Sequence, residues 1–135
     1  MKSFVYCEGK KIEFEIPSGW EVLYDKEIAP ARPCIDPIEE VKRSLDHPIG
    51  SPSIEDLASQ AGRAVILFDD LTRPTPASIA FPEVLNRLNQ GGIPDSRITA
   101  VCATGTHSPP DEAGLKQMMG AKAYARLYPM VFCHD

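Results

Sequence analysis

The chain of 135 residues lacks any apolar run near the roughly 18 residues that a membrane-spanning helix needs. It also lacks a basic surface, because its 14 Lys and Arg residues are outnumbered by 19 Asp and Glu residues and the net charge is -5. The only adjacent basic pairs are Lys10-Lys11 and Lys42-Arg43. We therefore expect no membrane span and no nucleic-acid partner.

Cysteines are few and far apart, with no C-x-x-C motif, and no charged and then apolar leader follows Met1. This pattern favours a reducing, cytoplasmic environment. Cys133, His134 and Asp135 together suggest a metal site at first sight, but no further ligand stands at a recognisable spacing. We expect no metal ligands in this chain.

The usual glycine-rich and nucleophile motifs are missing as well. The sequence contains no G-x-x-x-x-G-K-[ST], no G-x-G-x-x-G and no G-x-S-x-G. Their absence removes the common signatures of nucleotide-binding proteins and hydrolases.

An apolar run followed by a polar cluster dominates the middle of the chain. The run at residues 64–68 follows Gly62 and predicts a strand buried on both faces, as in a parallel sheet. Polar residues follow it directly, from Asp69 to Thr75. Ligands of open α/β sheets bind beyond the carboxyl ends of the strands, so this cluster is the first candidate site.

Composition divides the expected single domain into segments. Residues 1–28 alternate apolar and charged residues around a glycine and predict a small β-hairpin layer. Residues 29–62 begin with a proline-rich extended strap and continue with two helices, for which Asp36 and Ser53 are the expected N-caps. Residues 63–135 hold the core.

The core segment predicts a βαβ unit. A helix from Pro76 to Gln90 follows the strand at 64–68, with Pro82 as an alternative start, and a second apolar strand spans 97–103. A crossover of this length makes the two strands parallel. With further helices and a third strand at 129–133, we expect an α/β fold with a parallel-stranded βαβ core and flanking helices. The chain stops at the end of that strand, so we expect a fragment of a longer protein.

Two polar clusters are expected to meet at the carboxyl edge of this sheet. The second strand leads into Thr104-Gly105-Thr106-His107, and parallel strands present their ends at the same edge. There Arg73 offers a planar fork for a carboxylate or phosphate, and His107 can take and give protons near neutrality. Asp69 and Asp70 could orient that imidazole, hold a ligand hydroxyl or pair with Arg73.

A plainer interpretation stays open for the same residues. Asp70 and Arg73 could form a local salt bridge, with Thr72 capping a turn and His107 exposed in a loop. The polar loops would then be solvated and the chain a scaffold. The position of both clusters at equivalent strand ends favours a site.

The same residues carry a family resemblance. The motifs from Asp70 to Pro76 and from Ala103 to His107 resemble those of the N-terminal domain of the nickel-pincer-dependent lactate racemase family. The Gly-containing hairpin, the strap at Ala29-Pro30, the link at residues 48–52 and the closing His134-Asp135 fit the same family. The resemblance therefore covers most of the chain.

The resemblance implies the N-terminal part of a two-domain isomerase that racemises or epimerises a 2-hydroxy acid. In this family a nickel ion, held by a pyridinium-3,5-bisthiocarboxylic acid mononucleotide, accepts hydride from carbon while a histidine removes the hydroxyl proton. By position, His107 matches that acid/base and Arg73 matches the arginine that holds the substrate. The implied contacts to this nickel-pincer nucleotide are Asp70, Leu71, Thr72, Arg73, Thr104, Gly105 and Thr106.

Two departures limit the resemblance. Ser108 stands where the family usually has arginine, which implies a lost cationic contact and a different substrate. The family's second histidine, its cofactor-bearing lysine and its nickel-ligating histidine belong to sequence beyond Asp135. We therefore expect this chain to need its own C-terminal domain, and to be inactive and bind the cofactor weakly or not at all by itself. The rival hypothesis is a non-catalytic phosphate- or carboxylate-binding α/β module that uses Arg73 and residues 104–106.

Overall fold

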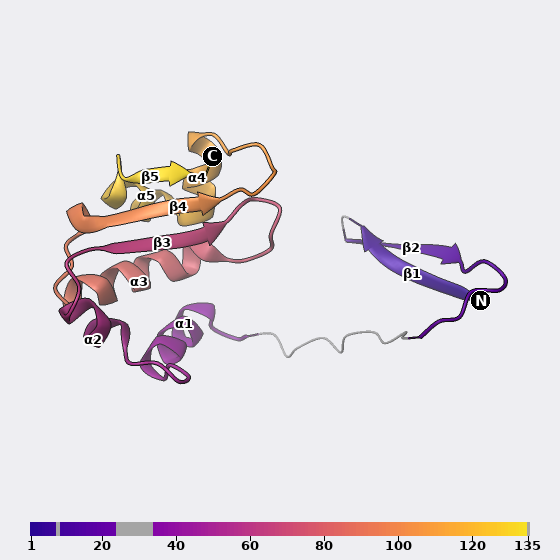
Figure 1. Cartoon of the computed structure of the whole chain (residues 1–135), viewed down its shortest axis with the longest axis horizontal. Coiled ribbons are helices and arrows are strands. Elements are labelled where there is room, and N and C mark those ends of the chain that lie inside the picture. Colours follow the sequence, from indigo (N-terminus) through magenta and orange to yellow (C-terminus); the bar gives the residue numbers. More distant parts are fainter. Residues whose placement is uncertain (8, 24–33, 135) are drawn as a thin grey trace. The chain divides into compact units, whose positions relative to one another are not determined.

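The computed structural model describes residues 1–7, 9–23 and 34–134. These residues form two compact units, one within residues 1–33 and one within residues 34–135 (Figure 1). Most of the expected proline-rich strap lies outside the described residues. None of the described helices is long and apolar enough to cross a membrane.

The first unit is a β-hairpin, as the alternating sequence predicts. β1 (Lys2–Cys7) pairs antiparallel with β2 (Lys10–Glu15). In the turn, Gly9 has a φ of 74°, a left-handed conformation that glycine adopts without a steric cost. Phe14 pairs in register with Ser3, three residues from Tyr6, so Tyr6 and Phe14 lie on opposite faces of the ribbon.

Two helices open the second unit, and both begin at the predicted caps. α1 (Pro37–Asp46) follows Asp36, whose carboxylate accepts hydrogen bonds from backbone N–H groups of the first turn. α2 (Ile54–Ser59) follows Ser53, whose hydroxyl accepts a backbone N–H at 3.1 Å. These bonds satisfy donors that a helix start leaves unpaired. α2 is shorter than expected and ends before Gly62.

A parallel sheet forms the centre of the second unit. Its three strands, in the order β3-β4-β5, are β3 (Ala64–Asp69), β4 (Ile98–Ala103) and β5 (Val131–Cys133). Both strand pairs are parallel, which confirms the predicted α/β fold. Asp69 pairs in register with Ala103, so β3 and β4 end side by side (Figure 1).

Three helices pack against one another along the sheet: α3 (Ala77–Gln90), α4 (Glu112–Met119) and α5 (Ala121–Leu127). The alternative start of α3 at Pro82 is wrong, because Pro82 lies inside the helix. Burial of Phe81 and other α3 side chains against the sheet outweighs the helix-breaking tendency of the proline.

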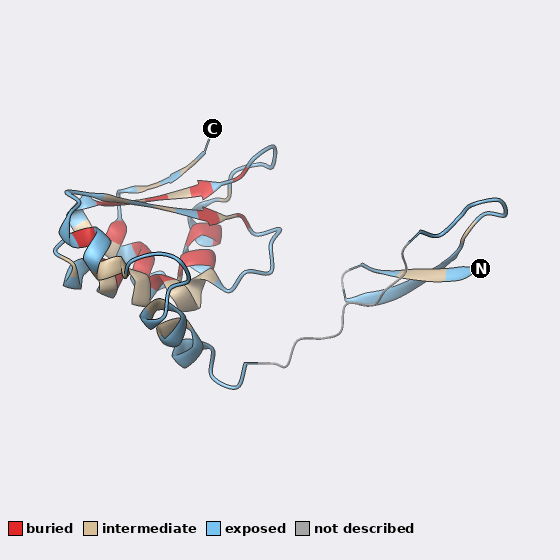
Figure 2. Cartoon of the chain, turned by 60° about the horizontal axis from the view of Figure 1, so that its bottom comes forward, coloured by how far each residue is buried: buried red, intermediate tan, exposed pale blue. Residues whose placement is uncertain are grey.

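The hydrophobic core lies between the sheet and these helices, where Figure 2 shows the buried residues gathered. Phe68 of β3 meets Phe81 of α3 edge to face, with ring centroids 5.2 Å apart. Burial raises the pKa of the Cys102 thiol to about 11. Side chains without exposed surface include Leu85, Ile98, Ala100, Cys102 and Met119. The core thus fixes where β3 and β4 end.

The prediction that β3 is buried on both faces is wrong for the described residues. Val65 is 60% exposed and Leu67 is 71% exposed, whereas their neighbour Phe68 is buried. The physical reason is that the described helices pack on one face of the sheet only (Figure 2). The other face carries apolar side chains in contact with solvent.

Arg87 of α3 joins the helices of the second unit. Its guanidinium donates to Glu55 of α2 at 2.7 Å, to Glu83 of α3 at 3.1 Å and to Asp46 of α1 at 2.5 Å. These carboxylates raise the pKa of Arg87 further above its usual range. α1 has no fully buried residue, and its half-buried Val41 and Leu45 leave the ion pair of Asp46 with Arg87 as a further contact to α3.

Candidate functional site

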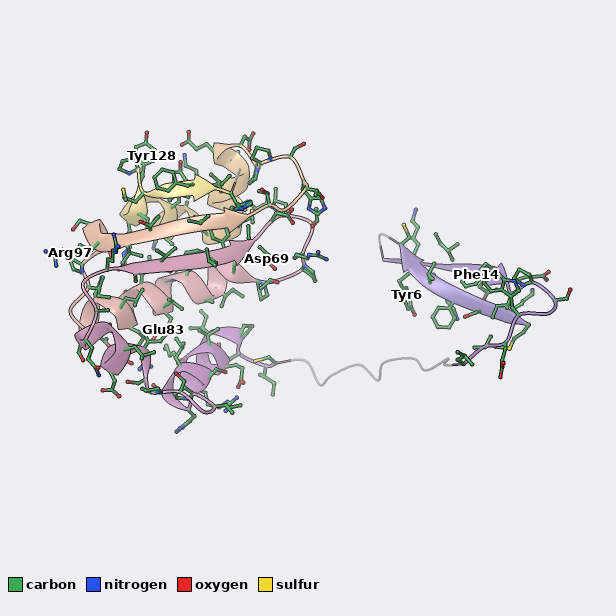
Figure 3. All side chains as sticks on the ribbon, in the orientation of Figure 1. Tyr6, Phe14, Asp69, Glu83, Arg97 and Tyr128 are labelled. Carbon is green, nitrogen blue, oxygen red and sulfur yellow. The ribbon has the colours of Figure 1, made fainter. Side chains whose placement is uncertain are left out.

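Two loops meet at the carboxyl edge of the sheet. One follows β3, whose last residue Asp69 is labelled in Figure 3, and the other follows β4. Between them lies a cavity of about 360 Å³. Its lining residues are Asp69, Asp70, Arg73, Ala103, Thr104, Gly105, Thr106 and His107. The parallel register of β3 and β4 therefore brings together the two clusters that the sequence singles out.

A direct contact between Asp70 and His107 joins the two loops. Oδ2 of Asp70 forms a hydrogen bond with Nδ1 of His107. Asp70 is only 7% exposed, whereas the His107 side chain is 48% exposed. The imidazole of His107 is therefore half-exposed at the cavity, and the buried carboxylate of Asp70 holds it from behind.

The second oxygen of Asp70 is held by Thr72. The Thr72 hydroxyl donates to Oδ1 at 2.6 Å, and the Thr72 backbone N–H donates to the same oxygen at 3.0 Å. These bonds, together with the bond from His107, lower the pKa of Asp70 to about 2. Asp70 is therefore an anion at neutral pH, and Thr72 supports it rather than lining the cavity.

The plainer interpretation of the sequence requires a salt bridge between Arg73 and Asp70, and the structure places the Arg73 side chain elsewhere. The Arg73 backbone N–H donates to the Asp70 carbonyl at 3.1 Å and closes a turn. No carboxylate of the described residues lies within ion-pair distance of its guanidinium, so the local salt bridge is not formed there. The Arg73 side chain lines both the larger cavity and an adjoining one of about 200 Å³. Among the residues that the structure describes, it is the one arginine that borders the larger cavity.

The loop after β4 is a tight turn. The His107 backbone N–H donates to the Thr104 carbonyl at 3.1 Å, and Gly105 between them has a φ of 60°. That left-handed conformation explains a glycine at this position. Thr104 is 3% exposed and donates its hydroxyl to the carbonyl oxygen of His134 at 2.8 Å, so Thr106 is the more accessible hydroxyl.

Leu71 does not line the larger cavity. It borders the smaller one and lies against the start of α4, where a Cβ on Gly114 would come within 3.2 Å of Leu71 Cδ1. Its predicted contact with a cofactor therefore stays a prediction, and the geometry favours a packing contact.

Two supporting contacts were not predicted from the sequence. Asp69 accepts a hydrogen bond from the Thr75 hydroxyl, which closes the loop after β3. The carbonyl of His134 orients Thr104, and the His134 backbone N–H donates to Cys102 at 2.8 Å. The spacing of Asp69 and Thr75, with Pro74 between them, was a usable signal. A backbone carbonyl leaves no signal in the sequence.

The cavity offers hydrogen-bond donors to an anion: a guanidinium, a hydroxyl and turn backbone beside one imidazole. Its two carboxylates already have partners within the chain, because Asp69 accepts from Thr75 and Asp70 is bound by Thr72 and His107. In the part of the chain that the structure describes, no group of three His, Cys, Asp or Glu side chains could hold a metal ion. The arrangement can bind a carboxylate or phosphate and exchange a proton through the imidazole.

Comparisons with known proteins agree on one relationship. Residues 7–135 match a family described as the lactate racemase N-terminal domain. A lactate racemase of Lactiplantibacillus plantarum is 46% identical over 71 residues, which are 53% of this chain and 16% of that protein. A lactate racemase of Thermoanaerobacterium thermosaccharolyticum is 36% identical over 67 residues, 50% of this chain and 16% of that protein.

The fold of this chain is also found in a solved structure. The lactate racemase apoprotein of Thermoanaerobacterium thermosaccharolyticum superimposes with a TM-score of 0.67 at 24% sequence identity. The match covers 100% of this chain and 30% of that one. This chain therefore spans less than a third of the solved relative.

Proposed function

Because this chain belongs to the family of lactate racemase N-terminal domains, we propose that it forms part of an isomerase that racemises or epimerises a 2-hydroxy acid. In this proposal His107 moves the hydroxyl proton and Arg73 holds the substrate carboxylate. The rest of the site comes from a C-terminal domain, in keeping with the much greater length of the relatives.

The residues around the cavity fit the nickel-pincer nucleotide that the family resemblance implies. Its phosphate and carboxylate groups are anions, and the cavity offers Arg73, the Thr106 hydroxyl and the turn backbone around Gly105. The family resemblance assigns the metal to the nucleotide and to a histidine beyond Asp135, so the proposal gives the residues of this chain contacts to the nucleotide and no metal ligand. When bound, the group supplies the uptake and return of hydride at the substrate carbon.

In this proposal, residues of this chain transfer the hydroxyl proton of the substrate and bind its carboxylate. An imidazole can accept the hydroxyl proton near neutral pH and return it after the configuration of the carbon has been inverted. A planar guanidinium binds a carboxylate through two parallel hydrogen bonds and so fixes the orientation of the substrate. The observation that carries the proposal is the half-exposed His107, beside Arg73 in the same cavity and backed by a buried carboxylate.

The experiment is a substitution in the longer natural protein loaded with its cofactor. We expect His107→Ala to lower the racemisation rate of a 2-hydroxy acid by about 10²- to 10⁴-fold, the usual contribution of a general acid/base. His47→Ala is the matched control, because His47 is an exposed residue at the end of α1. An unchanged rate in His107→Ala would rule out the assigned role.

A second candidate function follows from the position of Arg73. Its guanidinium borders the cavity beside residues 104–106 without a carboxylate partner among the described residues, which is what a simple anion-binding module also needs. Titration of this 135-residue chain with a mononucleotide or a hydroxy acid separates the two functions. Tight binding to the chain by itself would favour the module, and weak or no binding favours the enzyme.

Ser108 bears on the choice of substrate. It follows His107 directly, at the position where the family usually has arginine, and it is exposed. A serine offers a hydroxyl where an arginine would offer a positive charge. We propose that the substrate of this protein differs from lactate at the group that this position faces.

A further inference from the structure

The carboxylate of Asp70 is fixed at both oxygens by groups of this chain. Oδ1 accepts two hydrogen bonds from Thr72, at 2.6 and 3.0 Å, and Oδ2 contacts Nδ1 of His107. Asp70 is also 7% exposed, so its side chain has little freedom to turn toward a ligand. A carboxylate held in this way is better suited to orient a neighbour than to bind a cofactor.

The contact with Asp70 decides which nitrogen of His107 can react. An ionised carboxylate only accepts hydrogen bonds, so a neutral imidazole must carry its proton on Nδ1 to bond with it. The lone pair is then on Nε2. Among the groups that line the cavity, Arg73 can only donate, and the carboxylate of Asp69 accepts from Thr75 instead.

We propose that Asp70 is a positioning residue, which holds His107 in the tautomer with Nδ1 protonated and directs Nε2 toward the substrate. The orientation is a property of this chain. Its use in proton transfer rests on the proposed isomerase function. Asp70 acts through His107 and is not itself in contact with the reacting atoms.

The tautomer can be measured directly in the 135-residue chain by long-range ¹H–¹⁵N NMR spectra of the imidazole rings above pH 8. We expect His107 of the unmodified protein to show a protonated Nδ1 and an unprotonated Nε2. A His107 ring protonated on Nε2, or an even mixture of the tautomers, overturns the proposal. This readout needs neither cofactor nor substrate and no substitution.

Asp70→Asn tests whether Asp70 determines the tautomer of His107. The amide can present an N–H to Nδ1, so we expect the protonated Nδ1 form of His107 to be lost while the backbone amide spectrum stays that of the folded chain. Asp69→Asn is the matched control, since it removes the adjacent carboxylate, and it should leave the tautomer unchanged. Equal effects of both substitutions would contradict the proposal.

Thr72→Val is a second variant in case Asp70→Asn does not fold. It keeps the carboxylate but removes the 2.6 Å hydroxyl bond to Oδ1, and we expect a partial loss of the protonated Nδ1 form. No change in the tautomer would show that Thr72 does not fix the carboxylate, and this part of the proposal would be wrong.

The effect of Asp70 on catalysis is measured by steady-state kinetics of the longer natural protein loaded with cofactor. We expect Asp70→Asn to lower kcat by at least about 10-fold with little change in KM, because substrate binding stays with Arg73. A rise in KM with unchanged kcat contradicts a positioning role. If His107→Ala has no effect on the rate while the NMR result holds, the proposed function fails and the orientation of His107 by Asp70 stands.

Discussion

Gly91 lies against Ala58, where α3 ends beside α2. A Cβ added to Gly91 would fall 2.4 Å from Ala58 Cβ and 2.7 Å from the Glu55 carbonyl oxygen. These distances are far below van der Waals contact, and backbone is one of the obstacles. The absence of a side chain at position 91 is therefore what allows the two helices to approach each other.

We expect Gly91→Ala to destabilise the second unit by about 1–3 kcal/mol, the usual cost of overpacking. The measurement is the free energy of urea unfolding. Gly62→Ala is the matched control, because a Cβ at Gly62 would meet nothing within 4 Å and Gly62 does not have a positive φ. We expect that variant to be equal to the parent or slightly more stable. Equal effects of the two substitutions would contradict the close approach of α2 and α3.

Core packing predicts opposite results for two leucines. Leu85 on α3 has 0% exposure, so Leu85→Ala should destabilise the protein by about 2–5 kcal/mol through lost burial and the cavity left behind. Leu67 on β3 is 71% exposed, and Leu67→Ala should change the unfolding free energy by no more than about 0.5 kcal/mol. Urea unfolding of both variants checks the pair. A large loss in Leu67→Ala would show that the open face of the sheet is covered.

The lowered pKa of Asp70 predicts a pH-dependent contribution to stability. The ordinary pKa of this carboxyl is 3.8 and its pKa in the folded chain is about 2. The ionised, hydrogen-bonded carboxylate therefore stabilises the folded state fully above about pH 4, and the contribution is lost as the pH falls toward 2. Unfolding of the parent and of Asp70→Asn at several pH values should show a stability difference that shrinks over this range. A difference that stays constant from pH 7 to pH 2 would argue against the assignment.

The ion pairs of Arg87 predict that α1 is sensitive to salt. Arg87→Gln removes bonds to carboxylates on α1, α2 and α3, and the apolar residues of α1 are at most half-buried. We expect faster hydrogen exchange in α1 and a lower thermal midpoint in this variant. Arg43→Gln is the control, because the pair of Arg43 with Glu40 is exposed and lies within α1. Addition of salt to the parent should move its α1 exchange toward that of Arg87→Gln.

Local patterns in the sequence were sufficient to predict most of the fold. Capping residues such as Asp36 and Ser53 marked helix starts because a side-chain oxygen there satisfies backbone N–H groups within the same turn. The length of the crossover after β3 correctly predicted that β3 and β4 are parallel. The alternative start of α3 at Pro82 was wrong, because it considered only the local cost of a proline inside a helix. It left out the free energy gained when Phe81 is buried.

The candidate site was predictable only in outline. The ends of parallel strands brought Arg73 and His107 to one cavity, as expected. Which of the two adjacent carboxylates contacts His107 depends on alternation along β3 and on the hydrogen bonds that Thr72 donates to Asp70. The contact of Thr104 with the carbonyl of His134 depends on the pairing of β4 with β5, and no side-chain pattern encodes it.

The open face of the sheet has a consequence for the behaviour of the chain at high concentration. Within the described residues β3 pairs with β4 alone, so its other edge carries free N–H and C=O groups beside the apolar side chains of Val65 and Leu67. An exposed apolar edge strand is a template for strand addition from a second molecule. Concentrated solutions of the isolated chain are therefore prone to aggregate, and Leu67→Lys should delay the onset of turbidity.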